Sequence, residues 1–254
     1  MPKSKTTRLP VLLFVAGVIA LILVFVTLPA APSQAAPQSQ DMVITGVIDG
    51  PLSGGVPKAV EFYVINDIAD LSAYGFGSAN NGGGSDGQEF TFPAVSANAG
   101  DFIYVATETS GFHDFFGFDP DYTSNAASIN GDDAIELFEN GVVIDVFGDI
   151  NTDGTGEPWE YTDGWAYRKD GTGPDGSSFV LSNWTFSGTN ALDGETSNDT
   201  AATPFPIGTY SRGDVAPAVS STNPADGDTG VAENTNITIT FNEAVNVTDR
   251  KSVV

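Results

Sequence analysis

Short apolar runs alternate with turn residues along most of the chain after residue 40. Eight runs are rich in Val, Ile, Phe and Tyr and have the length of β-strands. The eight expected strands are Met42–Val47, Ala59–Ile65, Glu89–Phe92, Asp101–Ala106, Ala134–Phe138, Val142–Phe147, Trp165–Arg168 and Trp184–Phe186. Asn140-Gly141 lies between two of them and is the strongest short hairpin signal, because both central turn residues adopt positive φ. No window has sustained helical periodicity, so the pattern predicts an all-β sandwich or barrel.

Long polar segments separate some of these strands and divide the chain. We expect Ser78–Gly87 to be a flexible, exposed loop, because it contains five glycines and asparagines in a row. His113–Asn130 carries several aromatic residues and is expected to fold back over one end of the domain. The expected β-domain covers residues 41–210, and residues 211–217 form a linker. After the linker, residues 237–241 alternate as a strand does.

The first 40 residues have the pattern of an export signal. Lys3, Lys5 and Arg8 precede an uncharged apolar run at 11–28, and Ser33-Gln34-Ala35 is a small-x-small cleavage candidate. Residues 1–35 are therefore expected to be a signal peptide, followed by a short linker at 36–40. The run would reach roughly 27 Å as a helix, close to the hydrocarbon thickness of a bilayer, so an uncleaved membrane anchor is the alternative. In both cases the remainder of the chain is predicted to be outside the cytoplasm.

The charge balance limits the classes of molecule that the exported part is expected to bind. The 254 residues include 9 Lys and Arg against 33 Asp and Glu, for a net charge of -24. Such a surface repels phosphate backbones, so we expect no direct binding of nucleic acid and favour divalent cations or basic partners. The acidity also serves solubility, which is the simpler explanation. There are no cysteines, which excludes disulfides, thiolate zinc sites and cysteine nucleophiles.

Residues 41–210 resemble a lamin-tail-like domain. The segments that carry the resemblance come in the order of that family: 58–63, 69–76, 99–105, 130–138, 140–148, 163–168 and 184–185, of which NGDDAIELF at 130–138 and NGVVIDVFG at 140–148 are the most specific. The resemblance covers roughly two-thirds of the chain and implies an immunoglobulin-like β-sandwich. In bacteria this family often precedes an extracellular nuclease or phosphatase of the endonuclease/exonuclease/phosphatase type, which implies an accessory or binding role.

Residues 218–248 resemble the opening of an SbsA-type bacterial Ig-like domain, through APAVSSTNPADGDTGV at 216–231 and NITITFNEAV at 236–245. Only the first strands of such a domain are expected here, so residues 216–254 should be floppy or aggregation-prone. The last six residues, 249–254, depart from the family pattern. They are what GATCGGAAGAGCGTCGTG encodes, a string that looks like a sequencing adapter, and we expect them to be an assembly artefact.

One stretch has the pattern of a calcium loop. Residues 149–160 fit D-x-[DN]-x-[DN]-G-x5-E, and the predicted Ca²⁺ ligands are Asp149, Asn151, Asp153, Thr155 and Glu160. Side-chain oxygens, a backbone carbonyl and a bidentate carboxylate are the donors that calcium prefers. A strand enters the loop where an EF-hand has a helix, and position eight is Gly156 instead of a β-branched residue. A plain Asp/Gly turn is therefore the alternative.

The remaining candidate chemistry is sparse. His113 is the single histidine, has no recognisable triad partner, and is expected to be structural beside its phenylalanine neighbours. Trp159, Tyr161 and Trp165 either stack on sugars or pack in the core, and core packing is favoured. The Arg212-Gly213-Asp214 tripeptide is taken as coincidental.

The sequence thus predicts a non-catalytic, exported binding or scaffolding protein, secreted or on the cell surface. Its partner is expected to be an extracellular protein or polysaccharide, and it meets the membrane only through residues 11–28 if these are not cleaved. The alternative is an accessory N-terminal region of an extracellular nuclease or phosphatase. An enzyme within residues 41–210 is disfavoured, because no nucleophile and base are paired by a motif.

Overall fold

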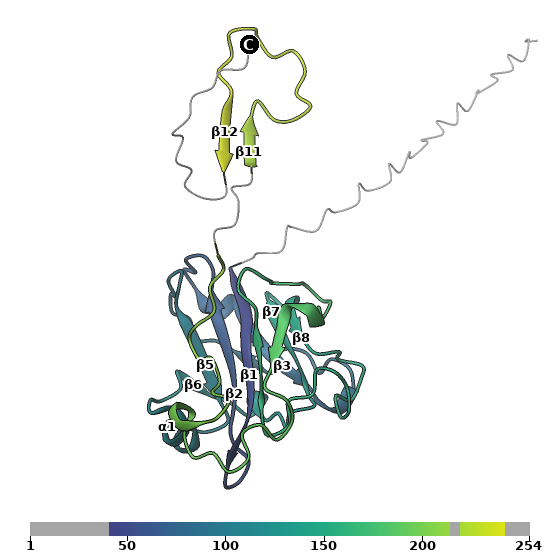
Figure 1. Ribbon diagram of the computed structural model, residues 1–254. Coiled ribbons are helices and arrows are strands. Elements are labelled where there is room, and N and C mark those ends of the chain that lie inside the picture. Colours follow the sequence, from purple (N-terminus) through teal and green to yellow (C-terminus); the bar gives the residue numbers. More distant parts are fainter. Residues whose placement is uncertain (1–40, 214–218, 242–254) are drawn as a thin grey trace, which may run out of the picture. The chain divides into compact units, whose positions relative to one another are not determined.

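The computed structural model describes residues 41–213 and 219–241, and each of these two parts is built from β-strands (Figure 1). The strands are β1 (Met42–Leu52), β2 (Val56–Val64), β3 (Tyr74–Ala79), β4 (Phe90–Thr91), β5 (Phe102–Ala106), β6 (Tyr122–Thr123), β7 (Ala134–Glu139), β8 (Val142–Phe147), β9 (Trp165–Arg168), β10 (Trp184–Phe186), β11 (Val219–Asn223) and β12 (Thr238–Phe241). The helices are α1 (Thr109–Phe116) and the 3₁₀ turns η1 (Leu71–Ala73), η2 (Asn80–Gly82), η3 (Asn125–Ala127), η4 (Leu181–Asn183) and η5 (Asn198–Thr200).

Residues 41–213 form two sheets. The six-stranded sheet has the order β10-β9-β1-β2-β5-β6, and the four-stranded sheet has the order β4-β3-β7-β8. All neighbouring strands are antiparallel except β5 and β6. The long β1–β2 hairpin forms the centre of the six-stranded sheet and places Met42 opposite Val64. This arrangement confirms the predicted predominance of β-structure.

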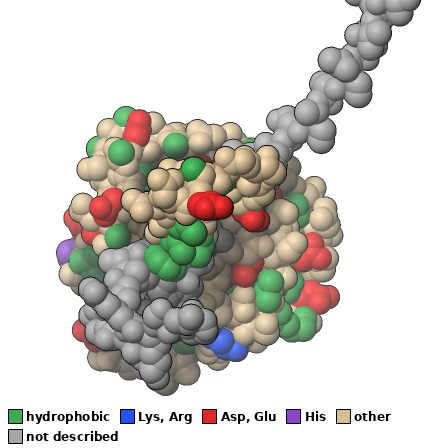
Figure 2. Space-filling model, turned by 90° about the horizontal axis from the view of Figure 1, so that it is seen from above, with side chains coloured by type: hydrophobic (Ala, Val, Ile, Leu, Met, Phe, Trp, Pro, Cys, Tyr) green, Lys and Arg blue, Asp and Glu red, His purple; other side chains and the backbone are tan. Residues whose placement is uncertain are grey.

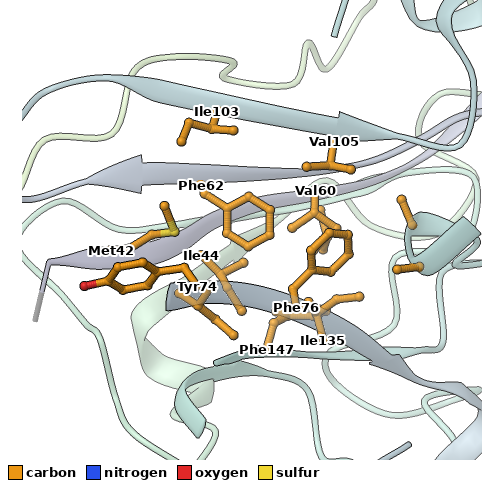
Figure 3. Packing of buried hydrophobic residues seen from close by; sticks show 14 of the residues in the cluster. Met42, Ile44, Val60, Phe62, Tyr74, Phe76, Ile103, Val105, Ile135 and Phe147 are labelled. Atoms are coloured by element: carbon orange, nitrogen blue, oxygen red, sulfur yellow. The ribbon is translucent and has the colours of Figure 1, made fainter. Parts of the chain in front are cut away.

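The hydrophobic core lies between the two sheets. Acidic side chains are spread over the face seen in Figure 2, whereas apolar side chains from both sheets point toward one another inside (Figure 3). Ile44 and Phe62 from the six-stranded sheet meet Phe76, Ile135 and Phe147 from the four-stranded sheet. All five are fully buried, and burying one such side chain contributes roughly 1.5–3 kcal/mol. The sequence thus stabilises the sandwich through its core, without disulfides.

A second apolar cluster covers the outer face of the six-stranded sheet. Val43 and Ile48 of β1 both face this side, because a β-bulge between Ile44 and Gly46 shifts the alternation of side chains by one residue. Phe112 and Phe115 of α1 and Phe205 pack against them. The central strands are therefore buried on both faces, which is why β1 is apolar at almost every position.

The predicted strands are confirmed, with bounds that shift at the ends. Val142–Phe147, Trp165–Arg168 and Trp184–Phe186 have the predicted bounds, whereas β1 continues to Leu52. The hairpin at Asn140-Gly141 is also confirmed, with φ of 49° and 76°. The sixth strand, β6, was not predicted, because a strand of two residues has no alternation to detect.

Strand β3 was missed because it reads YGFGSA. Gly75 and Gly77 point away from the core, and a Cβ atom on them would meet the backbone oxygens of Phe90 and Gly87. The segment that follows β3 therefore crosses directly over its outer face. Glycine in a strand interior marks such a close approach of another backbone, although it lowers strand propensity.

The expectation that no helix forms was wrong at α1. Glu108 caps its first turn by accepting a hydrogen bond from the N–H of Gly111 at 2.7 Å, and Gly117 ends it with φ of 81°. Phe112 and Phe115 lie three residues apart on the buried face. Two apolar positions are too few for a periodicity signal, so packing onto the sheet decides this helix. Part of the expected loop at His113–Asn130 is therefore helical.

The expectation that Ser78–Gly87 is a flexible, exposed loop was also wrong in part. Ser78 and Ala79 are buried in β3, and the N–H of Gly84 donates to the carbonyl of Ile150 at 2.8 Å. Gly82 lies so close to residues 152–153 that a Cβ atom would meet their backbone. The glycines thus permit a tight contact between two loops.

Residues 219–241 form an antiparallel ribbon of β11 and β12, in which Val219 lies opposite Phe241. The strand predicted at 237–241 is confirmed as β12. Val219, Ile237 and Ile239 are at least half exposed in this ribbon. No helix in the described part of the chain has the length and apolarity to cross a membrane. The predicted signal at 1–35 lies outside the described residues.

Candidate functional site

A groove of about 370 Å³ lies beside the outer face of the four-stranded sheet. Its lining comes from three places in the chain: the β7–β8 pair, the loop after β8, and the segment before η4. The lining residues are Glu136, Val146, Gly148, Asp149, Ile150, Asn151, Ser177, Ser178 and Phe179. Glu136 and Val146 are cross-strand partners, so their side chains lie on the same face.

Glu136 is a buried carboxylate of this groove. Its exposed fraction is 4%, and its Oε2 atom accepts a hydrogen bond from Ser85 Oγ. Its Oε1 atom has no hydrogen-bond partner in residues 41–213 and 219–241. The strand alternation places Glu136 on the face opposite to Ile135 and Leu137. The neighbouring loops cap this face of the sheet.

The predicted calcium ligands do not converge. Asp149 and Asn151 line the groove, whereas Asp153, Thr155 and Glu160 do not. Asp149 Oδ1 accepts from the N–H of Asn151 at 3.0 Å, and Asp153 Oδ1 accepts from the N–H of Thr155 at 3.0 Å. Glu160 Oε2 accepts from the N–H of Gly156 at 2.7 Å. Each carboxylate thus stabilises its own turn, as Asp does in Asx turns.

The three carboxylates of the predicted calcium loop each accept a local hydrogen bond. Among the described residues, no three Asp, Glu or His side chains come together in a way that could hold a metal ion. The hydrogen bonds to Thr155 hold the pKa of Asp153 below its usual value. Calcium binding stays a prediction of the sequence, and it requires the carboxylates to leave these local hydrogen bonds. Calorimetry with millimolar calcium tests it.

The turn at Asp132-Asp133 holds the loop in place. Asp132 accepts from Gly154 N–H through its carbonyl at 3.0 Å, and from Thr155 Oγ1 through its carboxylate at 2.9 Å. Asp133 accepts from Asn81 N–H at 2.8 Å, and burial raises the pKa of its carboxyl. The two aspartates therefore connect both loops beside the groove. Asp133 also accepts a local hydrogen bond, from the N–H of Asn130 at 3.1 Å, so the pair has both local and distant partners.

A second buried carboxylate, Glu61, lies on the outer side of the six-stranded sheet. It accepts hydrogen bonds from Thr45 Oγ1, Tyr167 Oη and the N–H of Gly208, each at 2.7 Å. Burial raises its pKa from 4.5 to about 7. Tyr167 Oη in turn accepts from the N–H of Tyr210 at 2.9 Å. This cluster fastens residues 208–210 to the sheet, and no sequence pattern predicted it.

A buried ion pair joins β9 of the six-stranded sheet to β8, an edge strand of the four-stranded sheet. Arg168 Nη2 lies 2.7 Å from Asp145 Oδ2, and neither side chain is exposed. Arg168 also donates to the carbonyl of Ile44 at 2.6 Å and lies over the Trp184 ring at 4.5 Å. Asp175 pairs with its second nitrogen, Nη1. These contacts hold the guanidinium between the two sheets.

The other candidate residues have structural positions. Trp159, Tyr161 and Trp165 are buried, so the prediction of core packing is confirmed and stacking on sugars does not fit them. His113 lies on α1, with its Nδ1 atom 2.7 Å from Asp119 Oδ1, and both side chains are more than half exposed. The sequence offered no acidic partner for this histidine. Asp214 of the Arg-Gly-Asp tripeptide lies outside the described residues.

The family comparison concerns the C-terminal part of the chain. Residues 213–254 match a family model described as a bacterial Ig-like domain. No curated protein matches significantly, and no solved structure does. The match supports a bacterial Ig-like domain at residues 213–254, whereas the lamin-tail resemblance and the SbsA type stay predictions. The matched range includes residues 249–254, and their origin from an adapter also stays a prediction.

Proposed function

We propose that this chain is an exported, non-catalytic binding or scaffolding module of the bacterial cell surface or extracellular space. The observation that carries the proposal is the match of residues 213–254 to a bacterial Ig-like domain. A β-sandwich without cysteines precedes this match in the chain. Consecutive β-domains of this kind suit the display and the binding of other molecules.

The positions of the buried polar groups support a non-catalytic role. Glu61 and Asp145 are deeply buried carboxylates, and both are saturated by hydrogen bonds from the protein. His113 is on the surface with Asp119, and no serine or threonine hydroxyl among the described residues hydrogen-bonds to it. A nucleophile with its base within hydrogen-bond reach would have pointed to catalysis.

We further propose that residues 41–210 form a lamin-tail-like domain and residues 218–248 the start of an SbsA-type Ig-like domain. The two most specific segments of the lamin-tail resemblance, 130–138 and 140–148, coincide with the β7–β8 hairpin and the turns on either side. That hairpin contributes to the core and to the groove. The accessory role beside a nuclease or phosphatase is the alternative function.

Expression of the full chain with a C-terminal tag in a bacterium tests export. We expect the tag outside the cytoplasm and a mature N-terminus at Ala36, because the small residue at position 35 follows the apolar run at the usual distance. Fractionation, protease accessibility of intact cells and N-terminal sequencing measure this. A chain that starts at Met1 or Pro2 and stays in the cytoplasm would contradict the proposal.

Turnover assays test the non-catalytic role. The purified chain is expected to hydrolyse neither phosphodiesters nor phosphomonoesters above background, with and without divalent cations. His113→Ala serves as the control, because the general acid–base residue of an enzyme here would most simply be the single histidine. Turnover that this variant abolishes would replace the proposed function with an enzymatic one.

A further inference from the structure

The groove beside the four-stranded sheet contains a carboxylate of which only one oxygen atom is hydrogen-bonded within the described part of the chain. Glu136 is 4% exposed, and Ser85 Oγ is its single hydrogen-bond partner among the described residues. Burying an ionised carboxylate is costly unless hydrogen bonds or an opposite charge compensate. Glu61 and Asp145 have several such partners each, so Glu136 differs from them. Its Oε1 atom is available to a ligand in the groove.

The shape and lining of the groove indicate the class of ligand. Its volume of about 370 Å³ is much larger than a single metal ion needs. Val146, Ile150 and Phe179 supply apolar walls, and Asp149 and Asn151 supply oxygens at the loop. No lysine or arginine lines it. A ligand that fits has an aliphatic stem and a positively charged end.

The aromatic wall is held in a fixed position. The Phe179 ring lies 5.5 Å from the Phe147 ring and 6.3 Å from the Trp159 ring, both of which are buried in the core. Phe179 itself is half-buried, so part of its ring borders the groove. A cation that lies against an aromatic face gains roughly 0.5–1 kcal/mol at exposed sites. Phe179 and Glu136 therefore favour the same kind of group.

We propose that this groove binds the side chain of a lysine or arginine residue of a partner protein, with Glu136 as the counter-ion. The stem would pack between the apolar walls, and the cationic end would donate to Glu136 Oε1 and to the oxygens at the rim. The net charge of -24 attracts basic partners over a longer range. The inference deepens the proposed binding function by naming the site and the chemistry of the partner.

Calorimetric titration of the purified full chain with two short peptides tests the site. One peptide is acetyl-Gly-Arg-Gly-amide, and the other carries citrulline, which has the shape of arginine without its charge. We expect the arginine peptide to bind at least tenfold more tightly, and its affinity to fall as salt is added. Equal affinities, or no binding of the arginine peptide at millimolar concentration, would overturn the proposal.

Matched variants locate the binding. Glu136→Gln keeps the shape of the side chain and is expected to lower the affinity for the arginine peptide at least tenfold. Asp114→Asn removes one negative charge from exposed helix α1, on the side of the six-stranded sheet, and should leave the affinity unchanged. Equal losses in both variants would indicate only a general charge effect. Circular dichroism and thermal melting report whether each variant is folded.

A second variant keeps the test decisive if Glu136→Gln does not fold. Ser178→Lys places a cation at the exposed rim of the groove, and we expect it to reduce peptide affinity by a similar factor because it neutralises the site. Wild-type affinity in Ser178→Lys would contradict the proposal. Calcium that displaces the peptide through Glu136 would assign the groove to a metal instead. Either failure leaves the export results intact, so the two proposals can fail separately.

Discussion

At the scale of single residues, a few buried polar side chains hold the segments of the sandwich together, because each of them binds several partners. Glu61 binds the end of the described sandwich to the six-stranded sheet, and Arg168 connects Asp145, Asp175 and the backbone of β1. The guanidinium suits this position because its planar donors reach several acceptors at once. Removing one partner of such a pair typically costs about 3–5 kcal/mol, because a charge is left buried alone. These residues therefore determine which segments pack together, whereas the fold class follows from the pattern of strands.

The raised pKa of Glu61 makes stability depend on pH. The folded chain holds this proton with a pKa of about 7, whereas the ordinary value is 4.5. Between these values the folded state binds more protons than the unfolded state, so stability falls as pH rises through 7.

We expect Glu61→Gln to have a flatter profile of melting temperature between pH 4.5 and 7.5 than the wild-type chain. Burial also raises the pKa of Asp133 and Asp145, and their contribution is common to both proteins. The exposed Glu157→Gln is the matched control and should follow the wild-type profile. Parallel profiles for wild type and Glu61→Gln would contradict the claim that the raised pKa of Glu61 makes stability depend on pH.

At the scale of elements, the closest contacts between backbone segments occur at glycines. Some of these glycines lie in a strand, where the strand propensity of glycine is low. Strand β3 accepts a covering backbone because Gly75 and Gly77 have no side chains on that face. The same principle brings the Asn80–Gly82 turn against the loop after β8. The groove and its Glu136 depend on these contacts, since Ser85 belongs to the covering segment. The position of the site thus follows from element packing.

Gly77→Ala is expected to destabilise the sandwich by roughly 1–3 kcal/mol, because the new Cβ atom would meet the backbone oxygen of Gly87. Gly83→Ala is the control. Gly83 is exposed, has φ of -73°, and would bring its Cβ atom only to 3.2 Å from the carbonyl of Asn80. We expect it to change stability by less than about 0.5 kcal/mol. Urea unfolding measures both, and a neutral Gly77→Ala would show that the covering segment can move away.

At the scale of the whole molecule, the two described parts differ in how they bury apolar surface. Residues 41–213 have a core shared by two sheets, whereas the β11–β12 ribbon leaves Ile237 and Ile239 at least half exposed. A two-stranded ribbon is marginal in water without a further layer. The expectation that residues 216–254 are floppy or aggregation-prone stays a prediction, and proteolysis can test it.

Limited proteolysis of the full chain with thermolysin is expected to cut in residues 219–241 before it cuts in residues 41–213. The enzyme cleaves before exposed Ile and Val, and the ribbon opens more easily than a strand with a shared core. Mass spectrometry of the early fragments identifies the sites. The long β1–β2 hairpin offers many apolar positions as an internal control. First cuts within β1 or β2 would contradict this order of stability.

Much of the sandwich was predictable from local patterns. The apolar runs that became β7 and β8, and the Asn-Gly turn between them, are decided by residues close in sequence. Helix α1 and strand β3 were not predictable, because their stability comes from surfaces far along the chain. For the site, Asp149 and Asn151 stood out through a motif, whereas Glu136 appeared only as one member of an alternating strand.

The sequence by itself determined the β-rich fold, the cysteine-free core, the acidic surface and the expected export signal, since these depend on composition, periodicity and local turns. Only the tertiary structure decided which carboxylates are buried, and with which partners. It separated the predicted calcium ligands, and it placed Asp149, Asn151 and Glu136 around one groove. The physical reason is that burial and electrostatic environment are set by segments distant in the chain, which no local pattern encodes.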